Sequence, residues 1–107
     1  MTQGEVVNRY FDCLQRGDGT GAAELFTGDG VLDDGNGDHH DGHDAIVEFI
    51  SGLVRGVTVE QTRTIDRPGR VTVFGRVGSP ELTMSNFRWV FHLDGDRITH
   101  LGNSFIR

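Results

Sequence analysis

The stretch NFRWVFHLDGDRITHLGNSF, residues 86–105, says most about the fold of this chain. Up to Leu93 it alternates large apolar side chains with a second set that is polar except for Val90, which is the two-residue period of a strand with one buried face. Asp94-Gly95 is a strong short signal for a hairpin. We therefore predict two antiparallel strands, Leu82 to Leu93 and Arg97 to Ile106, joined by this turn.

Two more strands are predicted before this hairpin. Apolar residues at even spacing mark a strand over 57–65, which ends at the Arg67-Pro68-Gly69 turn. The same period marks a second strand from Val71 to Val77, which ends near Ser79-Pro80. With the hairpin, these make four consecutive strands in the second half of the chain.

The first half of the chain has a mainly helical pattern. Thr2 and Glu5 have the spacing of a capping box, in which each side chain binds a backbone N–H of the other residue. Apolar residues then recur at intervals of three and four until Gly17, which predicts one amphipathic helix. Its apolar face comprises Val6, Val7, Tyr10, Phe11 and Leu14.

Shorter elements follow this helix. A second, short helix is predicted over 20–26 with Thr20 as its cap, closed by Gly28 and Gly30, and a short strand over 31–34. The helical pattern is clearest over 43–55, from His43 to Arg55, where the apolar face is wide enough to pack across a sheet.

The loop GNGDHHDG, residues 35–42, resembles a metal site only superficially. His39 and His43 are four residues apart, a ligand spacing on a helix, but they straddle a glycine in a loop. Asp34 to Asp38 resembles the start of a calcium loop, but its sixth and twelfth positions hold His39 and Ala45. We predict no metal and a solvated loop that covers a pocket entrance.

Composition narrows the class of protein. A chain of 107 residues supports one hydrophobic core, and its net charge of −6 argues against nucleic-acid binding. Its one cysteine, Cys13, is expected to pack in the first helix and excludes an intrachain disulfide. No segment reads as a signal peptide or a membrane span, so we expect a cytoplasmic protein.

The order of elements and several strings resemble the nuclear transport factor 2-like superfamily. The strings are VVNRYFDCLQRGD, VLDD, GHDAIVEFI and VFHLDGDRITHLGNSF. The resemblance covers almost the whole chain. It is to the small-molecule branch of the superfamily, which includes SnoaL-like polyketide cyclases, ketosteroid isomerases and limonene-epoxide hydrolases. It implies one SnoaL-like domain, 1–107, of the α+β class, in which three helices pack on a cone-shaped, curved antiparallel sheet around a pocket.

The resemblance to ketosteroid isomerases assigns roles to three residues. Tyr10 falls on the tyrosine that donates a hydrogen bond to the substrate oxygen, and Asp34 on the general base. Trp89 replaces the family's third, acidic member, and an indole N–H is a weaker donor. At the mouth of an apolar cavity, desolvation would raise the pKa of Asp34. Asp34 could instead cap its strand, and Tyr10 could be a core residue.

Other positions complete the predicted site. The resemblance to epoxide hydrolases places their Asp-Arg-Asp set on Thr72, Arg70 and Asn103; both acids are absent, so we discount that reaction. Asn103 is expected to point inward as a neutral hydrogen-bonding group. The remaining predicted substrate-binding residues are Trp89, Phe49, Phe87 and His40. Core packing alone would also explain the aromatic strand face, with Asn86, Arg88 and His92 opposite it, in solvent or at a subunit interface.

These observations predict a cofactor-independent isomerase or cyclase for a hydrophobic carbonyl-bearing or polyketide-like molecule. Proton transfer through Asp34 and Tyr10, or shaping of the substrate by the pocket, would drive the reaction. The alternatives are a non-catalytic module that binds a small molecule or dimerises, and a protein-interaction domain. The resemblance implies a homodimer, and no nucleic-acid or membrane partner is expected.

Overall fold

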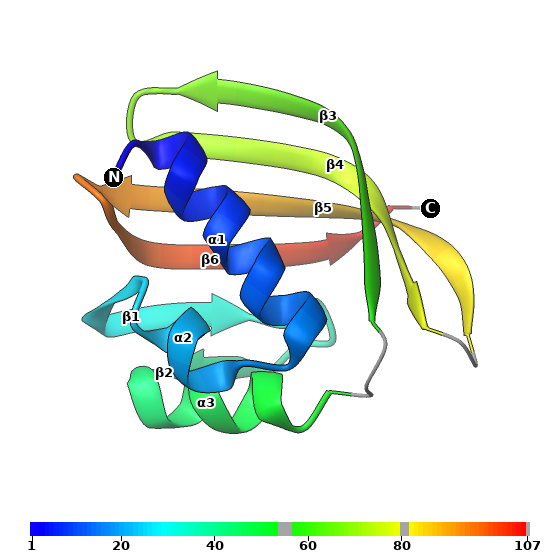
Figure 1. Ribbon diagram of the computed structural model, residues 1–107, viewed down its shortest axis with the longest axis horizontal. Coiled ribbons are helices and arrows are strands. Elements are labelled where there is room, and N and C mark those ends of the chain that lie inside the picture. The colour runs from blue at the N-terminus through cyan, green and yellow to red at the C-terminus, as the bar shows by residue number, and fades with distance from the viewer. Residues whose placement is uncertain (54–56, 80–81, 107) are drawn as a thin grey trace.

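The computed structural model describes residues 1–53, 57–79 and 82–106, and these form an α+β fold, as predicted (Figure 1). The helices are α1 (Gln3–Arg16), α2 (Gly19–Ala23) and α3 (His43–Ser51). The strands are β1 (Phe26–Asp33), β2 (His39–Asp41), β3 (Thr58–Arg67), β4 (Arg70–Ser79), β5 (Leu82–Asp94) and β6 (Arg97–Phe105). No helix in the described ranges is long and apolar enough to cross a membrane.

The strands form one curved, open sheet in the order β2-β1-β6-β5-β4-β3. Strands β3 to β6 follow one another as antiparallel neighbours, which confirms the four predicted strands and the hairpin at Asp94-Gly95. Among the described strands, the predicted curved, antiparallel sheet is confirmed for four of its five strand pairs, and the pair β1–β6 is parallel. The last strand, β6, lies between β5 and β1, so it connects the strands of the second half of the chain to those of the first half.

Helix α1 has the predicted ends. The Glu5 N–H donates to Thr2 Oγ1 at 3.2 Å and the Thr2 N–H donates to Glu5 Oε1 at 3.2 Å, which completes the capping box. Gly17 ends the helix at φ 68°, a left-handed conformation that glycine adopts without strain. Local sequence therefore determines both ends of α1.

The structure differs from the prediction around the second helix. Helix α2 begins after Asp18, whose side chain accepts a backbone N–H at 2.9 Å, so this aspartate and not Thr20 caps it. Strand β1 starts at Phe26, and Gly28 and Gly30 lie inside it. Its pairing with β6 shifts register over this segment, so these glycines belong to an irregular strand and not to a helix end.

Two other boundaries were predicted incorrectly. Three residues of the expected loop over 35–42 form β2, which pairs antiparallel with β1. They are polar and mostly solvent-facing, so no apolar alternation marks them as a strand. Helix α3 ends at Ser51 and not near Arg55, and residues 54–56 lie outside the described residues, as does Pro80.

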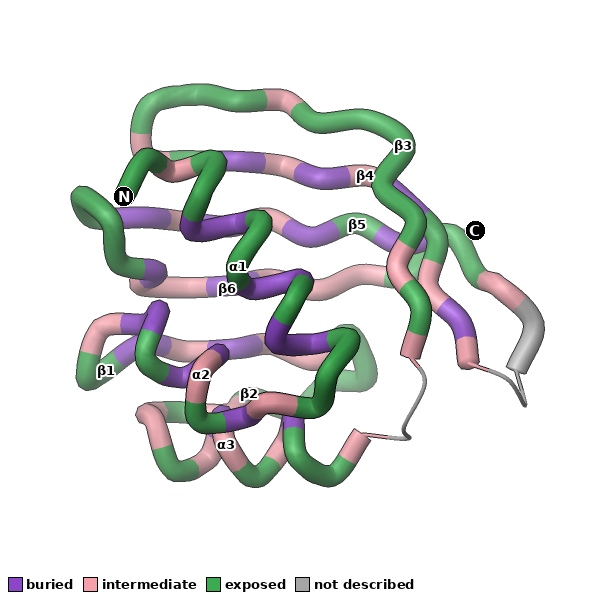
Figure 2. Tube along the Cα trace, in the orientation of Figure 1, coloured by how far each residue is buried: buried purple, intermediate pink, exposed green. Residues whose placement is uncertain are grey.

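The core lies between α1 and the middle of the sheet. Helix α1 crosses the sheet diagonally (Figure 1), and buried residues gather on α1 and on the central strands, whereas β3 is mostly exposed (Figure 2). The Tyr10 and Phe91 rings meet edge to face at 5.5 Å between centroids, and the Phe11 and Trp89 rings at 5.0 Å. These contacts hold Tyr10 over the sheet.

A glycine allows the edge strand to approach closely where the sheet bends. A Cβ added at Gly75 in β4 would clash with the Glu60 carbonyl oxygen of β3, just before a register shift between Gln61 and Arg63. We expect Gly75→Ala to lower the free energy of unfolding by about 1–3 kcal/mol, as overpacking does elsewhere. Urea unfolding measures this, with Gly28→Ala as the control because its Cβ would meet no atom within 4 Å. Equal unfolding midpoints for both variants would refute the prediction.

Candidate ligand pocket

A pocket of about 550 Å³ opens between the first helix, the third helix and the sheet. Its walls are largely apolar and aromatic. The structure brings together six of the seven predicted site residues along it: Tyr10, Asp34, Phe49, Phe87, Trp89 and Asn103. His40 does not line the pocket, but it contacts two residues that do.

Three of these residues stand in one row across the sheet. Asn103 on β6 is in register with Trp89 on β5. Asp33 is in register with Gly102 on the other side of β6, so Asp34, one residue after β1, follows beside Asn103. Strand pairing thus places a carboxylate, a carboxamide and an indole next to one another.

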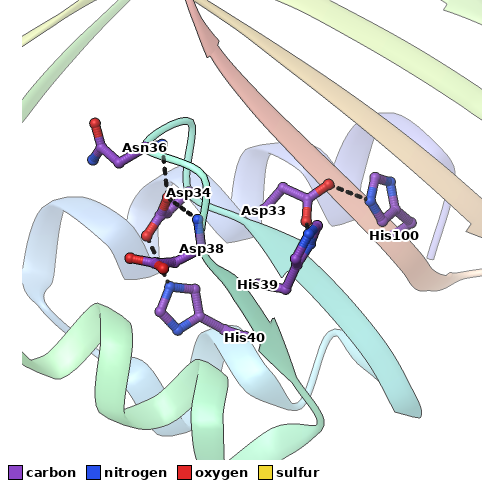
Figure 3. Close-up of polar contacts among 7 residues, drawn as sticks. All are labelled: Asp33, Asp34, Asn36, Asp38, His39, His40 and His100. Atoms are coloured by element: carbon purple, nitrogen blue, oxygen red, sulfur yellow. Dashed lines mark hydrogen bonds and ion pairs between the residues drawn. The ribbon is translucent and has the colours of Figure 1, made fainter.

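Asp34 is held by three hydrogen bonds (Figure 3). Its Oδ1 accepts the backbone N–H groups of Asn36 at 2.7 Å and Asp38 at 3.3 Å, and its Oδ2 accepts His40 Nε2–H at 3.1 Å. Desolvation raises the pKa of Asp34, but these bonds outweigh it and hold the pKa below its usual value. The predicted rise was wrong, because the sequence did not show that the loop turns its N–H groups onto this carboxylate.

His40 lies behind Asp34. Its ring stacks on Phe49 of α3, with centroids 4.3 Å apart and planes at 27°. Its side chain is 22% exposed, whereas that of Asp34 is 7% exposed. His40 therefore lies between the Asp34 carboxylate and solvent, and it also packs on Phe49, which lines the pocket.

Tyr10 presents a protonated phenol. Its side chain is almost fully buried, and this burial raises the pKa of the hydroxyl well above its ordinary value. Within the described ranges no hydrogen bond to the hydroxyl is present, and the residue lines the pocket. A neutral phenol in this position can donate a hydrogen bond to an occupant of the pocket.

The polar lining also contains unpaired groups. Asn103 Oδ1 and Ser79 Oγ are buried and have no hydrogen-bond partner among the residues that the structure describes. Ser79 and Phe105 were not predicted, although each lies two residues from another pocket residue, Val77 and Asn103, on the same strand face. Extending the two-residue period to the strand ends would have found both.

The other residues discussed from the sequence lie apart from the pocket. His43 Nε2–H donates to the Phe26 carbonyl at 2.9 Å, away from His39. No group of three His, Cys, Asp or Glu side chains in the described part of the chain could hold a metal ion. Arg70 and Thr72 do not line the pocket. Cys13 is buried in α1, as predicted.

A second polar cluster lies on the outer side of β1 (Figure 3). His39 Nδ1 and His100 Nε2, the latter at 2.8 Å, contact the two oxygens of Asp33. Desolvation raises the pKa of Asp33, but the bonds from His100 and His39 outweigh it and the net pKa is lowered. The His92 ring lies 5.5 Å from that of His100, and desolvation together with the His100 and Arg70 charges lowers its pKa.

The Asp33 cluster predicts a pH-dependent contribution to stability. Because the pKa of Asp33 is lowered on folding, its contribution is present at neutral pH and is lost as the pH falls through the lowered value. We expect Asp33→Asn to lower the free energy of unfolding by about 1 kcal/mol at pH 7. The difference should shrink as the pH falls below about 3.9, the ordinary pKa of an aspartate. Denaturant titrations across pH measure this, with the solvent-exposed Asp29→Asn as control; a pH-independent difference would contradict it.

Comparison with known proteins identifies a family and several solved structures with the same fold. A family model for the SnoaL-like domain matches residues 7–101. A protein from Sphaerobacter thermophilus is 30% identical, with all of this chain and 98% of that one covered and a TM-score of 0.84. No curated protein has a significantly similar sequence.

Two further solved structures share the fold. The Anabaena orange carotenoid protein binding canthaxanthin is 23% identical, with 99% of this chain and 36% of that one covered and a TM-score of 0.89. A candidate polyketide cyclase from Sinorhizobium meliloti is 23% identical, with 94% of both chains covered and a TM-score of 0.78.

Proposed function

This chain belongs to the SnoaL-like domain family of the nuclear transport factor 2-like superfamily, and on that premise we propose that it is a cofactor-independent isomerase or cyclase. Its substrate is a hydrophobic carbonyl-bearing or polyketide-like molecule. One observation carries the proposal: the carboxylate of Asp34 lines the same largely apolar pocket as the phenol of Tyr10, which has no hydrogen-bond partner in the described part of the chain. The resemblance in fold to a candidate polyketide cyclase agrees with it.

The proposed reaction needs only these two groups. Asp34 accepts a proton from the carbon next to the substrate carbonyl, and Tyr10 donates a hydrogen bond to the oxygen, where negative charge develops. Asp34 then returns the proton to a different carbon, which moves the double bond. In a cyclase the same enolate attacks a second carbonyl of the substrate, and the carboxylic acid protonates the resulting oxygen.

The aromatic walls supply the second part of the proposal. Trp89, Phe87 and Phe49 shape the pocket around a flat or flexible chain. Holding such a molecule with its reacting atoms close together lowers the barrier without proton transfer by the protein. The lowered pKa of Asp34 makes it a weaker base. Shaping of the substrate by the pocket therefore contributes a larger share of the rate acceleration than it would in a site whose base had a raised pKa.

A binding module is the second candidate. The three hydrogen bonds to Asp34 stabilise a carboxylate that need not react, and a protein of the same fold binds canthaxanthin. We propose for both candidates a cytoplasmic homodimer that forms through the outer sheet face bearing Asn86, Arg88 and His92. Sedimentation in dilute buffer tests the oligomeric state.

Turnover distinguishes the two candidates. The protein is incubated with β,γ-unsaturated ketones, beginning with 3-cyclohexen-1-one, and the absorbance of the conjugated enone is followed. Poly-β-ketones are tested in parallel for cyclised products, and binding of each compound is followed by Trp89 fluorescence. Product formed in proportion to protein supports the enzyme. Saturable binding of these compounds without product supports the binding module.

A further inference from the structure

The unpaired polar atoms of this protein gather at the pocket. In residues 1–53, 57–79 and 82–106, two side-chain atoms are buried without a hydrogen-bond partner, Asn103 Oδ1 and Ser79 Oγ. Both residues line the pocket. Buried polar groups in native proteins are nearly always paired, and leaving one unpaired is costly. Their shared position indicates that an occupant of the pocket supplies the partners.

Asn103 is the better placed of the two. It stands in the row between Asp34 and Trp89, where the proposed chemistry takes place. Gly35, at φ 84°, brings the loop against this strand: a Cβ there would lie 3.1 Å from the Asn103 carbonyl oxygen. The close approach holds the loop that follows Asp34 against the backbone of β6 at Asn103.

The neighbouring groups decide which chemistry complements Asn103. No Lys, Arg or His is among the residues lining the pocket in the described part of the chain. The buried, unpaired atom of Asn103 is Oδ1, and Asp34 also presents oxygens, whereas Nδ2 of the same carboxamide is a donor. A ligand group that approaches these two oxygens pairs with them when it is an O–H or N–H donor, and a carbonyl, ether or carboxylate oxygen in that place is repelled.

We infer that Asn103 is a specificity-determining residue that accepts a hydrogen bond from an O–H or N–H donor of the ligand. The inference rests on the proposed small-molecule pocket and narrows its substrate class to carbonyl compounds bearing a hydroxyl or amino group near the reacting carbon. Asp34 remains available for that carbon. A hydrocarbon ketone leaves Asn103 Oδ1 unpaired and binds less tightly.

Matched probes with one bicyclic core test this. Binding of 2-naphthol, 2-methoxynaphthalene and naphthalene is measured by calorimetry at pH 7 on the wild-type protein. We expect 2-naphthol to bind about tenfold more tightly than 2-methoxynaphthalene, the value of one net hydrogen bond. A fourth probe, the ammonium of 2-(aminomethyl)naphthalene, separates the two donor sources: tighter binding than 2-naphthol assigns an amine, and weaker binding a hydroxyl.

Two variants locate the preference. Asn103→Leu should bind 2-naphthol and 2-methoxynaphthalene equally while retaining naphthalene. Asn8→Leu is the matched control, since Asn8 is solvent-exposed on α1 and lies outside the pocket, so this variant should keep the wild-type ranking. The wild-type ranking tests the inference even if Asn103→Leu does not fold.

Failure of the inference about Asn103 can be distinguished from failure of the proposed function. Equal binding of the naphthol and the ether by the wild-type protein, or tighter binding of the ether, overturns the inference and leaves the proposed pocket intact. A donor preference that persists in folded Asn103→Leu also overturns it. Absence of binding by every probe overturns the inference together with the proposed function on which it rests.

Discussion

Asp34→Asn is expected to reduce kcat by about 10²-fold, the lower end of the usual contribution of a general base, because its lowered pKa makes Asp34 a weak base. The amide keeps an oxygen that can accept the N–H groups of Asn36 and Asp38, so the loop is preserved, but it cannot take up a proton. The rate of enone formation from a β,γ-unsaturated ketone measures the loss. Because the pKa of Asp34 is lowered, we expect the wild-type rate to be constant from neutral pH down to about pH 4 and to fall only below it.

Asp38→Asn is the control for this variant. It removes a carboxylate of the same loop, and Asp38 is solvent-exposed and not part of the pocket. Its kcat should equal that of the wild type. An unchanged kcat in Asp34→Asn would remove Asp34 as the base and leave substrate shaping by the pocket as the source of the rate. Circular dichroism of both variants verifies that the fold is retained.

Phe91→Ala is expected to lower the free energy of unfolding by about 3–5 kcal/mol. Phe91 is fully buried, and its ring contacts those of Tyr10 and Phe11 in α1, so its removal leaves a cavity between helix and sheet. Since small domains have only about 5–15 kcal/mol of stability, much of the protein would unfold at moderate temperature. Urea unfolding followed by Trp89 fluorescence measures the loss.

Phe105→Ala is the matched control, because it removes the same side chain from a half-exposed position on the neighbouring strand. We expect it to cost well under half as much. A comparable loss in the two variants would show that α1 is not anchored by the ring cluster around Phe91.

Periodicity in the sequence was sufficient for the long elements and for the inward-facing residues on them. Tyr10 lies on the helical stripe of α1, and Phe87, Trp89 and Phe91 alternate on β5, so repeat spacing and burial coincide. The expectation that Asn103 points into the pocket came from the family resemblance alone. These residues lie on regular helices and strands, where the repeat spacing of the element determines which way each side chain points.

The chemistry around Asp34 could not be predicted in the same way. Its pKa depends on the turn that brings the Asn36 and Asp38 N–H groups to Oδ1 and on the ring of His40, which β2 positions. A three-residue polar strand has no hydrophobic pattern to reveal it. The direction of the pKa shift is therefore a property of loop geometry, and burial alone suggested the opposite direction.

The position of β6 also determines when the pocket can exist. Asp34 and Asn103 come from opposite halves of the chain and become neighbours only when β6 inserts between β1 and β5. During synthesis, β1, β2 and α3 leave the ribosome long before this partner, while β3, β4 and β5 can already pair by local hairpins. We therefore expect the nascent chain to hold a half-sheet and an undocked helical half, with the ligand site completed last, when β6 through Phe105 has left the exit tunnel.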